Sequence, residues 1–245
     1  MKIAVAQSSS VKGDVNANID NHVRYIEQAS LHGVNYLIFP ELSLTGYEME
    51  LAKELVFKPN DERLGPLIDA AVKYNITVGV GAPIQSKGSE KIGLFIIHNT
   101  GQTETYEKIY LHEGEDVYFS SGDQYRIVQL EQETIANAIC ADTVNSIHAK
   151  TCVELGASIY AAGVLVTPDG YAKDSKMWAG YADEYKILVA IANFNKPSGG
   201  LPAAGKSAIW YKGGLLAQAG EAQDALVIAQ RNDGVWVGEV HEIPK

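Results

Sequence analysis

The order of strand-like and helix-like segments is the feature that most limits the folds open to this chain. Two apolar runs, KIAVAQ at 2–7 and NYLIFP at 35–40, flank a segment whose apolar residues recur at helical spacing. Those residues are Ile19, Val23, Ile26 and Ala29, and the pattern stops at Gly33. A helix that joins two strands in this way predicts a β-α-β unit at the start of the chain.

The same alternation continues along the chain. A helix is expected over 62–74, then the strand ITVGVGA, and then two β runs within 92–109 that meet at a hairpin turn over 99–101. After Cys140 we expect a helix near 146–155, a strand at 158–162, a helix over about 173–185 and the strand ILVAIAN. The last third is β again, with turns at 213–214 and 232–234. This order predicts an α/β (α+β) fold in which two mixed β-sheets pack together with helices outside.

Length, composition and charge narrow the class of protein. The 245 residues are 46% apolar and 20% charged, and no linker divides them, so we expect one domain over 1–245. The net charge of −10, without a run of five like charges, argues against a nucleic-acid partner. The start MKIAVAQSSS turns polar too soon for a signal peptide, and eighteen apolar residues never follow one another. We therefore expect a cytoplasmic protein with no membrane partner.

The cysteines and histidines imply neither a disulfide nor a metal. Cys140 and Cys152 are the only two cysteines, and their spacing is not that of a redox pair, so both are expected to be reduced thiols. The six histidines include no pair at metal-ligand spacing. No metal and no cofactor are implied.

Three polar residues each follow a strand-like run. Glu41 follows YLIFP, Lys108 lies between Tyr106 and Tyr110 in TYEKIYLH, and Cys140 ends TIANAI. Side chains at the ends of adjacent strands can converge at one edge of a sheet, which is where we expect these three. A cysteine in this position is more often a small core residue, and a charged group at a strand end is more often simply solvated.

The same three residue types are sufficient for amide hydrolysis. A carboxylate in an apolar pocket can have its pKa raised enough to deprotonate a thiol. A lysine can then stabilise the oxyanion that forms when the thiolate attacks a carbonyl group. The sequence therefore offers a route through a thioester that needs neither histidine nor metal.

The motifs LIFPELSLTGYE, YEKIYLH and ANAICADT resemble, in this order, the three signatures of the nitrilase superfamily of carbon-nitrogen hydrolases. Further segments, from KIAVAQ to GKSAIWYKGGLLAQAG, extend the resemblance over nearly the whole chain. The resemblance implies a four-layer α-β-β-α sandwich, with Glu41 as general base, Lys108 as oxyanion stabiliser and Cys140 as nucleophile.

The resemblance also implies a second glutamate and a backbone oxyanion donor. Glu115, seven residues before Gly122, matches the second glutamate best, and Glu113 is the alternative. The N–H of Ala141 would help to hold the oxyanion. Cys152, within AKTCVELGA, is expected on a helix and in the core.

The function implied by the resemblance is hydrolysis of a non-peptide C–N bond, and the expected substrate is the amide of a small molecule. Nitrile or N-carbamoyl hydrolysis by the same residues is the alternative substrate class. Two other classes are a nitrilase-fold scaffold or binding protein without turnover, and a peroxide-sensing thiol protein, which usually needs a resolving cysteine. A homodimer or higher homo-oligomer is expected.

Three features depart from this interpretation or compete with it. Ala141 stands where the family commonly has a bulky aromatic residue, and the final VWVGEVHEIPK is shorter than the family's usual tail. Residues 200–207, GLPAAGKS, fit the phosphate-loop pattern in full. A phosphate loop must lead into a helix, whereas a β-type run, AIWYKGG, follows Ser207, so no nucleotide site is expected here.

Overall fold

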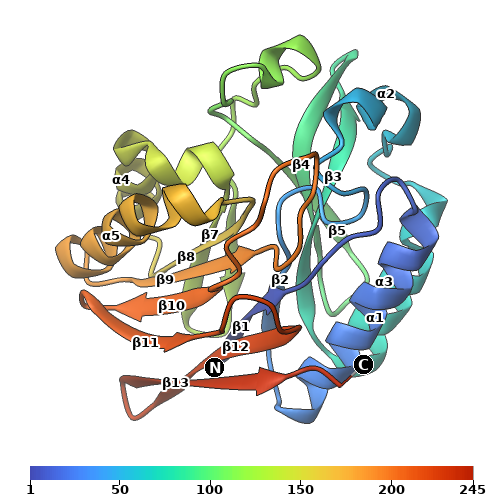
Figure 1. Ribbon diagram of the computed structural model, residues 1–245. Helices are drawn as coiled ribbons and strands as arrows, with labels where there is room; N and C mark the ends of the chain where they lie inside the picture. Colours follow the sequence, from blue (N-terminus) through green and yellow to red (C-terminus); the bar gives the residue numbers. More distant parts are fainter. Residues whose placement is uncertain (245) are drawn as a thin grey trace.

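Two mixed β-sheets lie face to face at the centre of the computed structural model, which describes residues 1–244. Helices cover the outer face of each sheet, so that the layers run α-β-β-α (Figure 1). The four-layer sandwich expected from the sequence is confirmed. No helix within residues 1–244 is both long enough and apolar enough to cross a bilayer.

The first sheet has seven strands in the order β13-β12-β1-β2-β3-β4-β5. β1, β2 and β3 pair in parallel, and the other neighbours pair antiparallel. The turns predicted at 99–101 and 232–234 join β4 to β5 and β12 to β13. The strands are β1 Lys2–Gln7, β2 Tyr36–Ile38, β3 Thr77–Ser86, β4 Ser89–Ile97, β5 Thr103–Glu107, β12 Ala225–Asn232 and β13 Val235–Glu242.

The second sheet has six strands in the order β11-β10-β9-β8-β7-β6. β7, β8 and β9 pair in parallel, and the outer strands pair antiparallel. Residues 212 and 213 connect β10 to β11, one residue before the predicted turn. The strands are β6 Ile127–Leu130, β7 Glu133–Ile139, β8 Ile159–Val164, β9 Leu188–Asn193, β10 Ala208–Tyr211 and β11 Gly214–Gln218.

The helices divide between the two sheets. α1 and α3 cover the seven-stranded sheet, and α4 and α5 cover the six-stranded sheet (Figure 1). α5 begins before the predicted start near 173, because the Thr167 hydroxyl accepts the Gly170 N–H and Pro168 occupies the first position. The helices are α1 Val15–Leu31, α2 Ala52–Leu55, α3 Gly65–Tyr74, α4 Ser146–Glu154 and α5 Pro168–Glu184, with 3-10 turns η1 Met49–Leu51, η2 Glu62–Leu64, η3 Glu115–Val117 and η4 Cys140–Val144.

Alternation along β1 shows how one strand serves two layers. Ile3 and Val5 belong to the core between the sheets, whereas Ala4 and Ala6 face the separate core beneath α1 and α3. Successive side chains of a strand point to opposite faces, so a strand between two apolar layers reads as a continuous apolar run. Each large apolar side chain buried in this way contributes about 1.5–3 kcal/mol to folding.

The segment 200–207, which fits the phosphate-loop pattern, leads directly into β10 and not into a helix. Ser207 is buried, and its hydroxyl donates to the Asn193 carbonyl at 3.2 Å and accepts the Asn193 N–H at 2.9 Å. The segment is therefore part of the sheet framework, as expected.

Two glycines, one from each sheet, enclose residues 39–42. A Cβ on Gly81 of β3 would lie 2.4 Å from the Leu42 backbone nitrogen, and a Cβ on Gly163 of β8 would lie 2.3 Å from the Phe39 carbonyl oxygen. Neither separation is possible for a real Cβ, so only glycine lets the backbone of 39–42 pack against both sheets. The position of this segment therefore depends on both glycines.

Substitution of a tightly packed glycine should lower the free energy of unfolding, whereas substitution of an exposed helical glycine should raise it. We expect Gly163→Ala to lower the free energy of unfolding by about 1–3 kcal/mol, because residues 39–42 must move. Gly180→Ala, on an exposed part of α5 with nothing within 4 Å of the new Cβ, should raise it by about 0.5–1 kcal/mol. Urea unfolding followed by circular dichroism measures both. Equal stabilities for the two variants would contradict this account of the 39–42 segment.

Candidate active site

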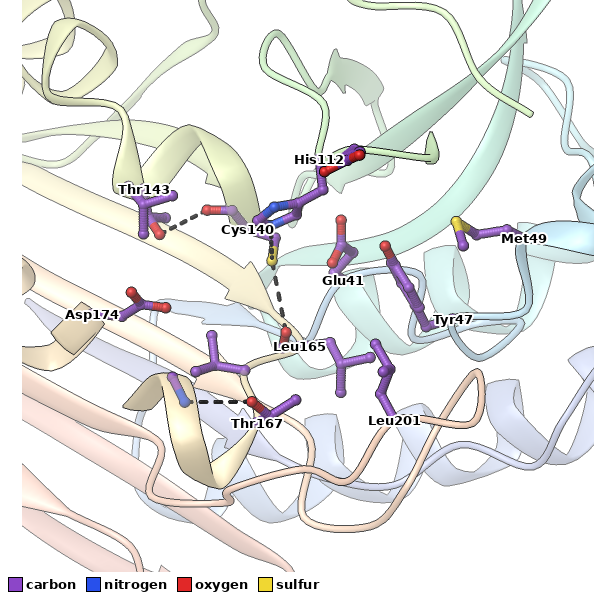
Figure 2. Close-up of a pocket in the computed structure, with 14 residues that line it drawn as sticks. Glu41, Tyr47, Met49, His112, Cys140, Thr143, Leu165, Thr167, Asp174 and Leu201 are labelled. Carbon is purple, nitrogen blue, oxygen red and sulfur yellow. Dashed lines mark hydrogen bonds between the residues drawn. The ribbon is translucent and has the colours of Figure 1, made fainter. Parts of the chain in front are cut away.

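Glu41 lies where the chain leaves β2 and passes between the two sheets. Pro40 cannot donate a ladder hydrogen bond, so strand pairing ends there. Leu42, the residue after Glu41, has a φ of 51°, which bends the chain sharply. The Glu41 side chain is only 1% exposed and lies beside Cys140 (Figure 2).

Lys108 directly follows β5, and its backbone N–H donates to the Ile92 carbonyl at 2.8 Å. Its side chain is fully buried, and Nζ donates to Glu41 Oε1 at 2.7 Å and to Glu115 Oε1 and Oε2 at 2.7 and 2.9 Å. Burial by itself lowers the pKa of Lys108, but the surrounding acidic groups outweigh this and raise it above its usual value. The ammonium group therefore stays charged.

Glu115, in η3, is the second glutamate that contacts Lys108. Its carboxylate also accepts the Tyr47 hydroxyl at 2.7 Å and the His112 backbone N–H at 2.8 Å. Glu113, the alternative left open by the sequence, is exposed on the rim of a pocket. The geometry thus places Glu115, and not Glu113, against the lysine.

Cys140 directly follows β7 and begins η4. Its φ of 42° lies in the left-handed region, which costs a residue with a side chain about 1–2 kcal/mol. Sγ lies 3.3 Å from His112 Nε2 and 3.8 Å from the Leu165 carbonyl oxygen. Burial raises the pKa of the Cys140 thiol, the Glu41 charge raises it further, and Lys108 opposes both. The sulfur at rest is therefore a thiol that needs a base.

The three predicted residues meet between two sheets and not at one edge of a single sheet. Glu41 and Lys108 follow strands of the seven-stranded sheet, whereas Cys140 follows β7 of the six-stranded sheet. Even β2 and β5 are not neighbours, because β3 and β4 separate them. The expectation of a common sheet edge was wrong, since the sequence pattern does not show which strands share a sheet.

Asp142 ties the two sheets together beneath the site. Its Oδ1 accepts the N–H groups of Ile109 at 3.1 Å and Tyr110 at 2.9 Å, which follow Lys108 in the chain. Its Oδ2 accepts the Tyr106 hydroxyl at 2.6 Å and the Ile139 N–H at 3.0 Å. A fully buried carboxylate with four donors holds the Lys108 segment against the turn that carries Cys140.

Glu41 retains one carboxylate oxygen that can accept a proton. Oε1 accepts from Lys108, but Oε2 is buried and has no hydrogen-bond partner within residues 1–244. Burial raises the pKa of Glu41 to about 7; Lys108 opposes this shift and Glu115 adds to it. A carboxyl group with a pKa near neutrality can take the thiol proton and later return it.

A pocket of about 340 Å³ opens over Cys140 and Glu41 (Figure 2). Its apolar wall includes Met49, Leu165 and Leu201, and its lining contains no lysine or arginine. This volume suits a small molecule. Three further lining residues were not singled out from the sequence, because they belong to no strand-end pattern: His112, Tyr47 and Asp174.

Ala141 and Cys152 occupy the environments expected for them. Ala141 is the second residue of η4, and the first N–H groups of a helix have no acceptor within it. Its N–H is thus suited to bind an oxyanion, and this role stays a prediction. Cys152, on α4, is 1% exposed, and burial raises the pKa of its thiol to about 12. Its placement in the core is confirmed.

One group of potential metal ligands lies outside the pocket. The donor atoms of His32, Glu239 and His241 all lie within 4.8 Å of one another, although the histidines are far apart in sequence. Sequence spacing missed this group because α1 and β13 bring it together. The Lys2 ammonium donates to the His32 carbonyl at 2.8 Å, so a cation bound here would meet a like charge nearby.

The two thiols should differ strongly in reactivity towards a small neutral electrophile. With limiting iodoacetamide, peptide mass mapping should place the label on Cys140, because only this thiol lines the pocket beside a proton acceptor. The rate should rise through about pH 7, where Glu41 loses its proton and can act as a base. Glu41→Gln should slow labelling roughly a hundredfold. Equal labelling of Cys140 and Cys152 in the folded protein would contradict the site.

Solved structures share this fold over almost the whole chain. One is a variant of the amidase from Nesterenkonia sp. AN1 in which acrylamide has added to the active-site cysteine. It is 21% identical, with a TM-score of 0.86, and the match covers 95% of this chain and 93% of that one. A cysteine-to-alanine mutant of the same amidase in complex with butyramide has a TM-score of 0.84 at 21% identity, over 93% and 89% of the two chains.

Sequence relatives point in the same direction. A nitrilase from Pyrococcus abyssi is 26% identical over 238 residues, which is 94% of this chain and 89% of that protein. The glutamine-dependent NAD(+) synthetase of Thermotoga maritima is 25% identical over 166 residues, which is 65% of this chain but only 29% of the synthetase. The match to the synthetase is therefore to a part of a much longer protein.

A family model decides the assignment. The model of the carbon-nitrogen hydrolases matches residues 2–236. The matched range contains the buried Glu41 and Lys108, the turn that carries Cys140, and the strands that bring them together. The chain therefore belongs to the carbon-nitrogen hydrolase family, the nitrilase superfamily.

Proposed function

We propose that this protein hydrolyses the amide bond of a small molecule through a thioester on Cys140, with residues 1–245 acting as one hydrolase domain. The observation that carries the proposal is the charge arrangement on the pocket floor. Lys108 Nζ lies 2.7 Å from Glu41 Oε1, and Oε2 of the same carboxylate has no partner within residues 1–244. A proton acceptor and a thiol thus line one pocket, and a buried cation is hydrogen-bonded to the proton acceptor.

In the first half of the reaction, Glu41 takes the proton from the Cys140 thiol, and the thiolate attacks the amide carbonyl carbon. The carbonyl electron pair moves onto oxygen, where Lys108 Nζ and the Ala141 N–H stabilise the negative charge. Collapse of this intermediate breaks the C–N bond. The leaving amine or ammonia takes the proton from Glu41, and the acyl group remains on sulfur.

In the second half, water enters the pocket and attacks the thioester while Glu41 accepts its proton. The C–S bond breaks, the carboxylic acid is released, and the thiolate recovers a proton from Glu41. Glu115 is a positioning residue. Its carboxylate accepts a hydrogen bond from Lys108 Nζ at 2.7 Å and another from the Tyr47 hydroxyl at 2.7 Å, which keeps the ammonium group in place. The cycle is complete with the side chains of this chain alone, and it requires no cofactor.

A scaffold without turnover and a peroxide sensor both fit the geometry less well. Three ionisable groups, Glu41, Lys108 and Glu115, are at most 1% exposed. Removing such charges from water costs folding free energy that their pairing only partly offsets. A binding scaffold would gain stability from apolar residues in their place. A sensor needs a resolving thiol, whereas Cys152 lies in the core and outside the pocket lining.

The charges around the pocket favour neutral or cationic amides over anionic ones. Its lining contains the carboxylates of Glu41, Glu113 and Asp174 and no lysine or arginine. Glu113 and Asp174 form no ion pair within residues 1–244. A substrate carboxylate, as in N-carbamoyl amino acids and the ω-amides of dicarboxylic acids, would therefore meet like charges, and the nearby Lys108 is already paired with Glu41 and Glu115.

A series of amides matched in size tests this choice of substrate. Butyramide and 4-aminobutyramide should be hydrolysed with kcat/KM values at least roughly tenfold above that of succinamate, because one uncompensated charge contact is easily worth ~1.4 kcal/mol. Ammonia release provides the measurement. Asp174→Asn should lower the preference for 4-aminobutyramide over succinamate. Faster hydrolysis of succinamate than of butyramide would contradict the proposed substrate class.

Nitrile hydrolysis is the second candidate, since the Pyrococcus abyssi relative is a nitrilase and is similar over 94% of this chain. A nitrile carbon is attacked by the same thiolate, and the same groups supply the protons. Butyronitrile belongs in the same assay. A higher kcat/KM for butyronitrile than for butyramide would favour this candidate over the amide.

We also propose that the protein forms a homodimer or a larger homo-oligomer. β13 is the edge strand of the seven-stranded sheet, and Val235 and Val237 on it are 61% and 55% exposed. An exposed apolar edge strand offers unpaired N–H and C=O groups and apolar side chains to a second chain. Light scattering at micromolar concentration should give at least twice the 26.5 kDa mass of one chain. A mass of 26.5 kDa across this range would contradict the proposal.

A further inference from the structure

His112 contacts the reactive sulfur, although none of the roles assigned above includes it. Its Nε2 lies 3.3 Å from Cys140 Sγ, and it is the only nitrogen atom among residues 1–244 with a hydrogen bond to this sulfur. Figure 2 shows its ring beside Cys140, on a different side from Leu165. His112 lines the open side of the pocket and its contact with the sulfur is partly buried, whereas Glu41 approaches from the buried side.

The backbone of His112 is fixed by the same carboxylate that holds Lys108. Its N–H donates to Glu115 Oε2 at 2.8 Å, and its carbonyl accepts the Glu115 N–H at 3.1 Å. Glu115 in turn receives Lys108 Nζ on both oxygens. The backbone that carries the imidazole is therefore held in place, which limits the positions that the ring can take beside the sulfur.

Partial burial and the Lys108 charge keep the His112 ring neutral at pH 7. Burial of the ring and the Lys108 charge lower the pKa of His112, and they outweigh Glu115, Asp174 and Asp142, which act in the opposite direction. A neutral imidazole has one N–H and one bare nitrogen, and the tautomer can change. Nε2 can accept a hydrogen bond from the thiol in one tautomer and donate one to the thiolate in the other.

We propose that His112 is a further catalytic residue, whose Nε2 hydrogen-bonds the Cys140 sulfur and stabilises the thiolate in both halves of the reaction. This inference rests on the proposed thioester mechanism. It gives the sulfur a hydrogen-bond donor that is separate from the donors to the substrate oxyanion. Glu41 remains the base that takes and returns the proton. His112 donates its Nε2–H without losing it, so no additional proton enters or leaves the cycle.

The contact matters at two moments. When Glu41 removes the thiol proton, the negative charge on sulfur receives the Nε2–H hydrogen bond before the C–S bond forms. When water has added to the thioester and the C–S bond breaks, the departing thiolate receives the same hydrogen bond. A hydrogen bond to a charged group typically changes an equilibrium by roughly ten- to a hundredfold, so the thiolate population should change by that order.

The test measures how fast iodoacetamide alkylates Cys140 as a function of pH, in the intact protein and in two variants. His112→Ala removes the donor and should lower the rate at pH 7.5 roughly tenfold, with the midpoint near pH 7 unchanged because Glu41 sets it. His112→Gln keeps an amide N–H of similar reach and should recover most of that rate. His98→Gln, on the distant β4–β5 hairpin where His98 pairs with Glu104, serves as the matched control and should leave the profile unchanged.

Recovery of the rate in His112→Gln separates the proposed role from a structural one, because both variants lose the packing of the imidazole ring. His112→Ala with the rate of the unmodified protein would overturn the proposal, and so would a rate in His112→Gln as low as that in His112→Ala. Because alkylation requires no knowledge of the substrate, it is independent of the proposed function. If the rate falls in His112→Ala and recovers in His112→Gln but no amide or nitrile is hydrolysed, the hydrolase proposal fails while the His112 contact stands.

Discussion

The buried ammonium of Lys108, held between Glu41 and Glu115, is the interaction on which the rest of the site depends. All three side chains are at most 1% exposed, so each charge relies on the other two for the solvation it has lost. Removing one partner from such a group typically costs about 3–5 kcal/mol, because a buried charge is left unpaired. Burial raises the pKa of Glu41 to about 7, and the excess of negative charge left by two carboxylates on one cation adds to this shift.

The site needs both sheets, because neither sheet supplies all three of the side chains that the mechanism uses. Glu41 and Lys108 come from the seven-stranded sheet, and Cys140 comes from β7 of the other. Gly81 and Gly163 allow the backbone around Glu41 to lie directly against both sheets, and Asp142 connects the Lys108 segment to the turn after β7. The positive φ at Cys140 then turns the chain away from the strand ladder. The residue with the strained backbone is thus the same residue that carries the proposed nucleophile.

Much of the fold follows from local pattern, whereas the site depends on tertiary packing. The helix and strand of the first β-α-β unit and the 99–101 hairpin could be predicted because their apolar periodicity is regular. Which strands share a sheet could not be predicted, and the common sheet edge expected for Glu41, Lys108 and Cys140 was therefore wrong. His112 and Asp174 were missed because they reach the pocket from a loop and from the side of α5, where no local pattern marks them.

The central claim is that the acyl group passes through Cys140, and a trapped intermediate tests it most directly. An activated ester or amide that acylates faster than water clears the thioester should add one acyl group, seen by intact-protein mass spectrometry. The account predicts that this adduct is sensitive to hydroxylamine, maps to Cys140, and disappears in Cys140→Ala without a change in the far-ultraviolet circular dichroism. Turnover at an undiminished rate in Cys140→Ala, or an adduct on Cys152 or on a lysine, would contradict the mechanism.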